Sequence, residues 1–488
     1  MRLPASAIGN KIPPDSLSHT EVTIVATPRP NIVFILTDDQ GPWAAGCYGN
    51  PEIRTPNLDR LAAEGMLFRN FFVATPVCSP SRATFLTGRI PSQHGVHDWI
   101  REGNTGPDAA AYLQDEICYT DVLAQHGWTC GISGKWHLGA SQLPQHGFQH
   151  WYVHQKGGGQ YYNAPMIRDG ELIDEPGYVT DAITDDALQF LQTHAHDEAP
   201  FYLSVHYTAP HSPWEHHPPE IVASYDDCPF TSCPQEERHP WATGLTDACM
   251  NNRAMLQGYF AAVTAMDANV GRILDRLDDL GICESTLVIF VSDNGFSCGQ
   301  HGFWGKGNGT EPRNMYENSI KVPFILRHPG GIPAGFEQQA IVSAYDFMPT
   351  LLDYLGLPLP SERPIVGESA LPAFLGQENA GREQVVLYDE YGNTRMIRTA
   401  EWKYVHRYPD GPNELWDLVN DPDERHNCID DPAQAARIRE LRARMEEWFA
   451  RYVELMTDGL KQDVTGLGQL RPVNRPDDAD RPAYYREA

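Results

Sequence analysis

One short stretch, residues 78–82, places a cysteine close to a proline and an arginine. It reads Cys-Ser-Pro-Ser-Arg, and Pro80 stands where a helix could begin. The start of a helix offers unpaired backbone N–H groups and the positive end of the helix dipole, so Cys78 would face a pole that favours anions. Arg82 adds a fixed, forked cation. The stretch is compatible with a reactive cysteine and also with a small buried hydrophobic one, the commoner fate of a single cysteine.

Acidic side chains follow two predicted strands. Residues 31–37 form an apolar, β-branched run that is followed at once by Asp38 and Asp39, and a second such run leads to Asp293 and Asn294. Adjacent carboxylates at the end of a buried strand repel each other unless a cation is present. Carboxylate and amide oxygens suit Ca²⁺ or Mg²⁺ better than zinc. A solvated loop start is the alternative for each pair alone, and the two pairs together favour a metal site.

Cations and imidazoles follow two further strands. A short strand bounded by glycines leads to Lys135 and His137, and the apolar run 201–205 leads to a loop that contains His211. Lys306 lies in a glycine-rich stretch further along the chain. A lysine can hold an anion, and a histidine can move a proton near neutral pH. The alternative is a set of surface lysines and core histidines.

The elements that must position these residues are buried strands of one sheet. In an open α/β sheet, ligands bind beyond the carboxyl ends of the strands. Amphipathic helices, the longest of them over 251–280, separate the strands in the chain. We therefore predict an α/β fold with a large, mostly parallel or mixed central sheet flanked by helices. A cation, several fixed positive charges and two imidazoles at one edge would fit the transfer of a tetrahedral anion.

The chain divides into three parts. Residues 1–29 form an N-terminal extension, residues 30–375 the catalytic α/β domain, and residues 382–488 a smaller C-terminal subdomain. Several short strands and one charged helix predict a small antiparallel sheet with a helix in that subdomain, followed by a peripheral tail from about residue 457. Residues 215–247 show no periodicity and are predicted to be a loop inserted over the active-site face.

Composition excludes several classes of function. The chain of 488 residues carries 65 acidic and 37 basic side chains, for a net charge of −28. This charge argues against nucleic acid as a partner, and it means that an anionic substrate needs local cations. We expect no membrane partner, because the longest apolar runs are too short to span a bilayer. The ten cysteines form no Cys-x-x-Cys pair, so reduced thiols are expected. The first thirty residues lack the pattern of a secretory signal, which predicts a cytoplasmic protein.

The eleven residues 78–88, Cys-Ser-Pro-Ser-Arg-Ala-Thr-Phe-Leu-Thr-Gly, resemble the signature of the type I, formylglycine-dependent sulfatases of the alkaline phosphatase superfamily. Three more motifs agree with that family: Gly-Lys-x-His at 134–137, Pro-His-x-Pro at 210–213, and Asp-Asn-Gly at 293–295. Cys130 stands where the second signature usually has Ser or Thr. The resemblance runs from about residue 30 to residue 427.

The resemblance implies a reaction and a cofactor. Cys78 would be oxidised by a maturation enzyme to formylglycine (3-oxoalanine), whose hydrate attacks the sulfur of a sulfate ester and forms a covalent formylglycine-sulfate intermediate. One divalent cation, Ca²⁺ in the first place and Mg²⁺ in the second, would be held together with residue 78 by Asp38, Asp39, Asp293 and Asn294.

The resemblance also implies roles for the cations and histidines. Lys135 and Lys306 would hold sulfate oxygens, and Arg82 would support the formylglycine. His211 would protonate the leaving alcohol, and His137 would help to expel the sulfate.

Aromatic, imidazole and guanidinium groups in loops beside the motifs are candidates for substrate binding, with a small sugar sulfate or sulfated oligosaccharide, or another alkyl sulfate, as the expected substrate. These candidates are His97, Trp99, His301, Trp304 and Arg313.

Three alternatives remain at this point. A related enzyme would use the same formylglycine on phosphonate monoesters or phosphodiesters, and Ser79 and Ser81 favour the sulfatase only modestly. A non-enzymatic protein that binds an anion or a metal would keep Cys78 unconverted. A metallophosphatase would hold two metals and would normally carry Ser or Thr as its nucleophile.

Overall fold

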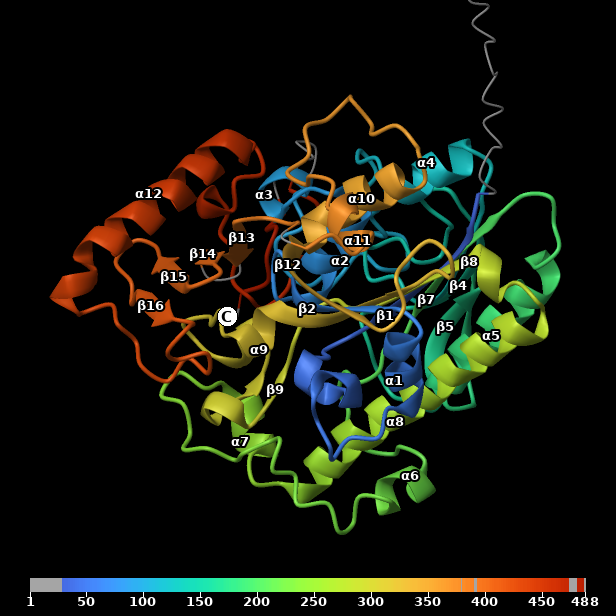
Figure 1. The fold of residues 1–488 in the computed structure, drawn as a ribbon, viewed down its shortest axis with the longest axis horizontal. Helices are drawn as coiled ribbons and strands as arrows, with labels where there is room; N and C mark the ends of the chain where they lie inside the picture. The colour runs from blue at the N-terminus through green and yellow to red at the C-terminus, as the bar shows by residue number, and fades with distance from the viewer. Residues whose placement is uncertain (1–28, 379, 390–392, 474–480, 487–488) are drawn as a thin grey trace, which may run out of the picture.

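The computed structural model describes residues 29–488 except 379, 390–392, 474–480 and 487–488. The predicted N-terminal extension therefore lies, apart from residue 29, outside the described residues. A ten-stranded mixed sheet runs through the molecule between two layers of helices, and a four-stranded antiparallel sheet with one long helix lies beside it (Figure 1). This architecture confirms the fold class expected from the sequence. Within the described part of the chain, no helix is long and apolar enough to cross a membrane.

The strand order of the central sheet places the four motif-bearing strands side by side. In spatial order the ten strands are β12 (Phe336–Ser343), β2 (Met66–Phe72), β11 (Lys321–Arg327), β8 (Thr286–Ser292), β1 (Asn31–Thr37), β7 (Phe201–His206), β3 (Thr129–Lys135), β4 (Phe148–His154), β5 (Ala164–Arg168) and β6 (Glu171–Glu175). The run β8-β1-β7-β3-β4 is parallel throughout. Its strands therefore end at one edge of the sheet, where the sequence places the acidic, cationic and imidazole groups.

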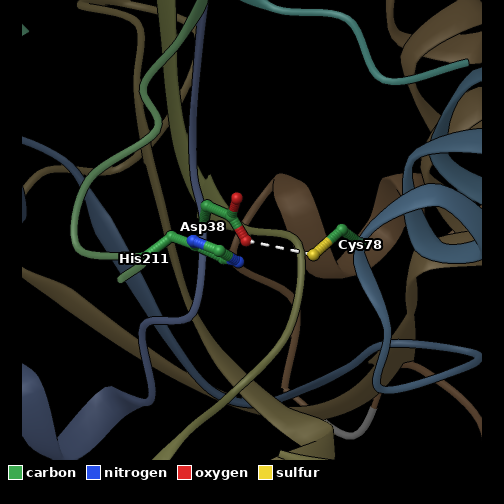
Figure 2. Close-up of side chains that lie close together, drawn as sticks. All are labelled: Asp38, Cys78 and His211. Atoms are coloured by element: carbon green, nitrogen blue, oxygen red, sulfur yellow. Dashed lines mark hydrogen bonds between the residues drawn. The ribbon is translucent and has the colours of Figure 1, made fainter. Parts of the chain in front are cut away.

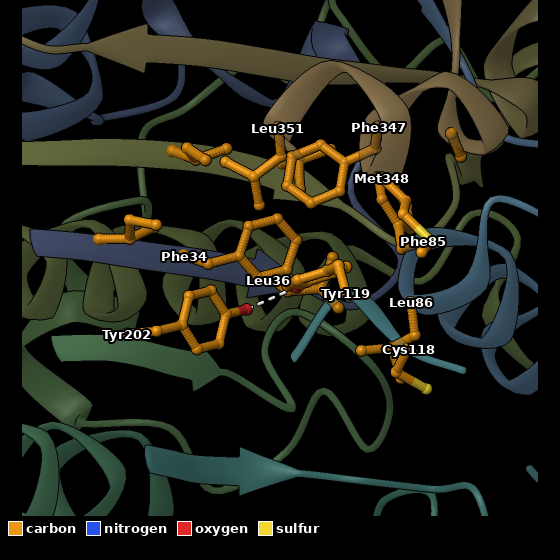
Figure 3. Packing of buried hydrophobic residues seen from close by; sticks show 14 of the residues in the cluster. Phe34, Leu36, Phe85, Leu86, Cys118, Tyr119, Tyr202, Phe347, Met348 and Leu351 are labelled. Atoms are coloured by element: carbon orange, nitrogen blue, oxygen red, sulfur yellow. Dashed lines mark hydrogen bonds between the residues drawn. The ribbon is translucent and has the colours of Figure 1, made fainter. Parts of the chain in front are cut away.

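Alternate residues of β1 enter two separate cores, as the period of a strand requires. Ile32, Phe34 and Leu36 face a core formed with α2 (Cys78–Thr87), α4 (Tyr119–Gln125) and α10 (Phe347–Tyr354). Figure 3 shows Phe34 of β1 between Phe347 of α10 and Tyr202 of β7. Tyr119 and Tyr202 join their hydroxyl groups across this core at 2.5 Å.

The other face of β1 packs on a second helical layer. Val33 and Ile35 lie in a core with α1 (Pro56–Ala63), α5 (Val179–His194) and α8 (Arg253–Asp279). Both faces of the strand are buried, which explains why its sequence is a continuous apolar run rather than an alternating one.

The helix α2 differs by two residues from the sequence-based expectation. It begins at Cys78 rather than at Pro80, because Val77 is still extended (φ −148°, ψ 141°). Proline is tolerated anywhere in the first turn, where its missing N–H costs no helical hydrogen bond. The helix ends at Gly88, whose φ of 65° is a left-handed conformation. All ten residues of α2 are buried.

The C-terminal subdomain has the predicted sheet and helix. Its strands are β13 (Gln384–Asp389), β14 (Thr394–Thr399), β15 (Trp402–Arg407) and β16 (Glu414–Asp417), all antiparallel, and its helix is α12 (Ala435–Tyr452). Leu441, Met445 and Phe449 of α12 pack against Ile397 and Tyr404 of the sheet. Four-residue spacing puts the three α12 side chains on one face.

The segment after α12 is not peripheral, contrary to the expectation from the sequence. Gln469 forms a β-bridge with Ile100, and the backbone of Tyr484 pairs with Gln469 in turn. The Tyr484 hydroxyl is 2.8 Å from Nδ1 of His97. We call residues 457–473 and 481–486 the C-terminal strap. Isolated backbone bridges leave no periodic pattern in a sequence, so composition alone did not reveal this packing.

Residues 215–247 are more ordered than the loop that the sequence predicts. They contain α6 (Pro219–Ala223) and the start of α7 (Gly244–Cys249). Backbone N–H groups of Glu236 and His239 donate to the carbonyls of Gly299 and Gly302. The segment thus packs on the chain around β9 (Ser297–Cys298) and β10 (Trp304–Gly305). The remaining α-helices are the short α3 (Pro91–His94), α9 (Glu317–Ile320) and α11 (Leu371–Phe374).

Candidate active site

A pocket of about 340 Å³ opens above the carboxyl ends of the central strands. It is lined by Val77, Cys78, Trp99, Ile100, Arg101, His137, Lys156, Gly157, Gly158, His211, Lys306 and Asn308. Four residues predicted to be catalytic, Cys78, His137, His211 and Lys306, therefore reach one cavity although they are far apart in the chain. No residue of the inserted segment 215–247 lines this pocket, and its placement over the active-site face stays a prediction.

Cys78 lies at the inner end of the pocket, on the first residue of α2. Its thiol donates a hydrogen bond of 3.3 Å to Oδ1 of Asp38, and Nζ of Lys306 lies 2.8 Å from the sulfur. Figure 2 shows the cysteine and His211 on either side of the Asp38 carboxylate. Burial, followed by the charge of Asp38, raises the pKa of Cys78 to about 12. The free thiol is therefore protonated at neutral pH, and the helix start does not ionise it.

Three carboxylates converge beside this cysteine. Ligand atoms of Asp38, Asp39, Cys78 and Asp293 all lie within 4.8 Å of one another, and all four residues are buried. Asn294 adjoins them, because its Nδ2 donates to Oδ1 of Asp39 at 2.7 Å. Burial, and then the charge of Asp38, raises the pKa of Asp293 to about 7. Close buried carboxylates of this kind fit a hard divalent cation, which prefers oxygen ligands.

Each of the three carboxylates also faces a positive side chain from another element. Lys135, the last residue of β3, donates to Asp38, and Lys306 donates to Asp39. Nε of Arg82 donates to Oδ2 of Asp293 at 2.9 Å, and its Nη1 donates to the carbonyl of Lys135 at 2.9 Å. Although burial alone would raise it, the pKa of Asp38 is held well below its usual range by Lys135, His211 and Lys306. The arrangement therefore brings three carboxylates and three positive side chains together beside Cys78.

Two histidines reach the pocket with different environments. His211 is partly exposed, its Nδ1 is 2.8 Å from the carbonyl of Ser212, and its Nε2 is 3.9 Å from Oδ2 of Asp39. Nδ1 must therefore be the protonated nitrogen toward Ser212, which leaves Nε2 for a ligand. His137 is buried, and its Nε2 is 3.0 Å from the carbonyl of Ile100. Burial and the charge of Lys135 hold the pKa of His137 well below its usual range, so the ring is neutral.

Sequence reasoning missed a glycine loop that covers these histidines. A Cβ on Gly157 would lie 2.1 Å from Cε1 of His137, and one on Gly158 would lie 3.1 Å from Nδ1 of His211. Gly157 therefore has no room for a side chain. The signal was present as three consecutive glycines after Lys156, but no motif connected them to the histidines. Arg101 and Lys156 of the pocket lining were missed as well, because single polar residues in loops carry no pattern.

Of the predicted substrate-binding residues, Trp99 lines the pocket, whereas His97 and Arg313 do not. The His97 ring is fully buried, with Nε2 at 2.8 Å from the carbonyl of Thr457 and Nδ1 against Tyr484. The Arg313 guanidinium is buried and donates to the carbonyl of Thr310 at 3.1 Å. Both side chains instead connect the catalytic part of the molecule to neighbouring loops.

His301 and Trp304 also lie outside the pocket lining. His301 stacks on Tyr316, with ring centroids 4.0 Å apart and planes 12° apart. Trp304 is completely buried and packs against Trp214 at a centroid distance of 5.2 Å. Their positions close to Lys306 in the sequence predicted that they line the substrate site. The turn around β10 directs both rings into the protein instead.

Comparison with known proteins agrees with this site. The sulfatase family model matches residues 30–357, and the model for the C-terminal part of N-sulphoglucosamine sulphohydrolase matches residues 299–451. The chain is 30% identical to the N-acetylglucosamine-6-O-sulfatase of Bacteroides thetaiotaomicron, over 91% of this chain and 90% of that protein. It is 33% identical to the N-acetylgalactosamine-6-sulfatase of Canis lupus familiaris, over 82% and 74% of the two chains. The chain belongs to the sulfatase family, and it is accordingly a hydrolase of sulfuric esters.

Solved structures show the same fold. One is a protein in complex with its substrate D-glucosamine-2-N,6-O-disulfate, at 29% identity and a TM-score of 0.76 over 88% of this chain and 99% of that chain. A phosphonate monoester hydrolase of Agrobacterium radiobacter has 21% identity and a TM-score of 0.66, over 87% and 96% of the two chains. The second likeness concerns the fold alone, and the fold does not separate the two activities.

Proposed function

We propose that this chain hydrolyses sulfate esters of carbohydrates by means of a formylglycine formed from Cys78 and one divalent cation. The observation that carries the proposal is the convergence of Cys78, three carboxylates and the Lys306 ammonium at the inner end of one pocket. The named relatives act on sulfated amino sugars, which supports a sugar as the alcohol part of the ester. The half-buried indole of Trp99 at the pocket wall offers a flat face on which a sugar ring can stack.

Residue 78 requires a change before it can act as a nucleophile. Its pKa of about 12 leaves the unmodified thiol protonated, and a cysteine lacks the second hydroxyl that lets a sulfate be expelled after transfer. A hydrated formylglycine supplies an oxygen nucleophile together with that second hydroxyl. Because all of α2 is buried, a maturation enzyme would have to reach residues 78–82 before the chain folds.

The carboxylate cluster would hold the cation, most consistently Ca²⁺ with its preference for several oxygen ligands. The ligands would be Asp38, Asp39, Asp293 and the amide oxygen of Asn294, beside residue 78. Bound there, the cation would offset the negative charge of the sulfate and of the attacking oxygen. Arg82 orients Asp293, and its second hydrogen bond to the end of β3 holds the two strand ends at a fixed separation.

The sulfate group would lie between fixed positive charges. Lys306 lines the pocket directly, and Lys135 lies beneath it against Asp38. Both ammonium groups are buried, so they act on the sulfate oxygens in a medium of low dielectric constant. They are already held in place before substrate arrives, and they therefore cost little reorganisation in the transition state.

The two histidines divide the proton transfers. His211 has its Nε2 free to hold the proton that the leaving alcohol takes up. His137 is neutral, its Nε2 donates to Ile100, and its Nδ1 is a buried atom without a hydrogen-bond partner among the described residues. That nitrogen is able to accept a proton from residue 78 in the second half of the reaction.

The mass of the tryptic peptide 70–82 from protein made in its native host tests the central step. Conversion of the thiol to an aldehyde lowers the mass by about 18 Da and would leave the nucleophile that the proposal requires. Hydrolysis rates of a 6-sulfated N-acetylglucosamine and of an aryl phosphodiester are then compared on the same preparation. An unmodified thiol in a host that matures other sulfatases, or faster hydrolysis of the phosphodiester, would contradict the proposal.

A further inference from the structure

The mouth of the active-site pocket has a charge opposite to that of the rest of the chain. The twelve lining residues include Arg101, Lys156 and Lys306 and no aspartate or glutamate, although the chain carries 65 acidic and 37 basic residues. Lys306 belongs to the sulfate position, next to Cys78. Arg101 and Lys156 are exposed and stand further out on the wall, where the reaction described above does not use them.

Lys156 is set at the mouth by the glycine loop. It directly precedes Gly157 and Gly158, which lie against the two pocket histidines. Its backbone N–H donates to Nδ1 of His154 at 3.1 Å, which fixes the start of the loop. Among the described residues, no carboxylate forms an ion pair with its ammonium group. A lysine held beside a cavity without an acidic neighbour has its charge available to a ligand.

Arg101 is held at the pocket wall by the C-terminal strap. Its guanidinium lies 3.8 Å from the ring centroid of Tyr485 and 5.6 Å from that of Trp99, and its Nη1 donates to the carbonyl of Leu467 at 3.1 Å. Gly468 allows the close approach, because a Cβ there would lie 2.6 Å from Cβ of Arg101. Stacking and one neutral hydrogen bond orient the guanidinium plane without neutralising its charge.

We propose that Lys156 and Arg101 bind a second anionic group of the substrate, next to the sulfate that is removed. The group is a carboxylate or a further sulfate on the same sugar or on the adjoining one. A molecule of net charge −28 repels a substrate with two anionic groups unless local cations receive both of them. Tyr485 is a positioning residue, since it acts on the substrate only through Arg101. This inference rests on the proposed sulfatase function and names the substrate class within it.

The test compares three substrates with the mature enzyme: 6-sulfated N-acetylglucosamine, D-glucosamine-2-N,6-O-disulfate, and a 6-sulfated N-acetylglucosamine linked to a uronic acid. We expect kcat/KM of the wild type to be about tenfold higher for at least one of the two substrates with a second anion, the gain of one charge-assisted hydrogen bond. The substrate that shows the preference identifies the second anion as sulfate or carboxylate.

Variants then assign the preference to the two cations. Lys156→Ala and Arg101→Ala should each reduce the ratio of kcat/KM between the doubly and singly charged substrates by about tenfold, mostly through KM. Tyr485→Ala should reduce the ratio as Arg101→Ala does, and Tyr485→Phe should restore it because the ring remains. Arg439→Ala, on the exposed surface of α12, is the matched control and should leave the ratio unchanged.

The outcomes separate the two proposals. Hydrolysis of all three substrates without a preference, or a preference that survives both Lys156→Ala and Arg101→Ala, overturns the second-anion site and leaves the sulfatase proposal standing. Failure to hydrolyse any of the three by protein with converted Cys78 overturns the proposed carbohydrate substrate, and the second-anion site with it.

Discussion

Two buried clusters of charge can be compared in this molecule. One is the active-site cluster of Asp38, Asp39 and Asp293 with its three cations. The other, which we call the junction cluster, joins the central sheet to the C-terminal subdomain and consists of Glu317, Arg398, Lys403 and Glu424. Both are buried, both contain paired ions, and both have shifted pKa values.

The junction cluster is complete in itself. Nζ of Lys403 is 3.2 Å from Oε1 of Glu317, contacts Glu424 and donates to the carbonyl of Met315 at 2.7 Å. The Lys403 ammonium group thus meets three oxygens, as many as it has protons to donate. The backbone N–H of Glu317 donates to Oε2 of Glu424 at 2.7 Å. A cluster of this kind holds two parts of a fold in register.

The active-site cluster is arranged differently. Its carboxylates converge on one another, Nδ1 of His137 is buried without a hydrogen-bond partner in the described structure, and a pocket reaches Cys78 and Lys306. Buried charge by itself therefore does not mark a catalytic site. Like charges that lie close together beside a cavity do mark such a site, because their repulsion is relieved only when a ligand or a cation binds.

The largest expected effect is on the active-site cluster. Cys78→Ala should reduce kcat for a sulfated sugar by about 10⁴-fold or more, as loss of a covalent nucleophile does in other enzymes. The melting temperature should change little, since alanine fits the first turn of α2. Steady-state rates and a thermal melt measure both. Cys428→Ser, in the C-terminal subdomain, serves as the control, and activity of Cys78→Ala close to the wild type would refute the role of residue 78.

The junction cluster should respond in the opposite way. Lys403→Met removes the ion-pair partner of the buried Glu424, while Glu317 keeps Arg398, and it should lower the free energy of unfolding by about 3–5 kcal/mol. The kcat of the protein that stays folded should be close to that of the wild type. Denaturant unfolding and active-site titration separate the two effects. Arg442→Met, which breaks an exposed pair with Glu446, should cost less than about 1 kcal/mol.

Removal of the metal should affect the active-site cluster and not the junction cluster. Chelation should abolish hydrolysis and lower the unfolding free energy of the wild type by about 3 kcal/mol relative to protein with cation at 100 times its Kd. The same treatment should leave the melting temperature of Asp293→Asn nearly unchanged, because that variant lacks one carboxylate of the site. If chelation lowered the stability of Asp293→Asn as much as that of the wild type, the stabilising cation would be bound elsewhere in the molecule.

A smaller effect is expected at the glycine loop. Gly157→Ala would place a methyl group against the His137 ring, so the loop or the ring must shift, and a misplacement of about 1 Å should reduce kcat by about 100-fold. Gly170→Ala, at a partly exposed turn with left-handed φ, is a control that strains the backbone without touching the histidines. If both variants lose the same activity, the close approach to His137 is not the cause.

The smallest effect is a dependence of stability on pH. Burial raises the pKa of Glu424 to about 7, and Lys403 only partly opposes it. Because the folded pKa exceeds the value of about 4.5 in the unfolded chain, this group stabilises the fold below pH 4.5, and that contribution is lost as the pH rises through 7. Between pH 5 and 8 the wild type should lose about 2–3 kcal/mol relative to Glu424→Gln, measured by thermal melts across the range. If the stability of Glu424→Gln fell with rising pH as much as that of the wild type, this prediction would be contradicted.

Local features of the chain predicted much of the fold. The continuous apolar runs identified β1, β7 and β8, and the amphipathic spacing over 251–280 identified α8 to within a few residues. The strands β4, β5 and β6 were not anticipated. Of these, β6 is an edge strand of the sheet, and only two of its five residues are apolar. The short antiparallel strands of the C-terminal subdomain were anticipated from their turn residues.

The chemistry of the site follows from residue types and from their places after buried strands. The residues of the four motifs follow buried strands, so any parallel sheet built from those strands must bring them to one edge. For that reason the order of strands and motifs along the chain is enough to group Asp38, Lys135, His211 and Asp293.

The surroundings of that chemistry depend on how distant loops pack against one another. His97 and Trp99 are two residues apart in one loop, yet the C-terminal strap buries the first and leaves the second at the pocket wall. The glycine loop and the strap bring Lys156 and Arg101 to the same opening from distant parts of the chain. Such contacts depend on the packing of loops that have no periodic pattern, so local sequence does not encode which side chain meets the cavity.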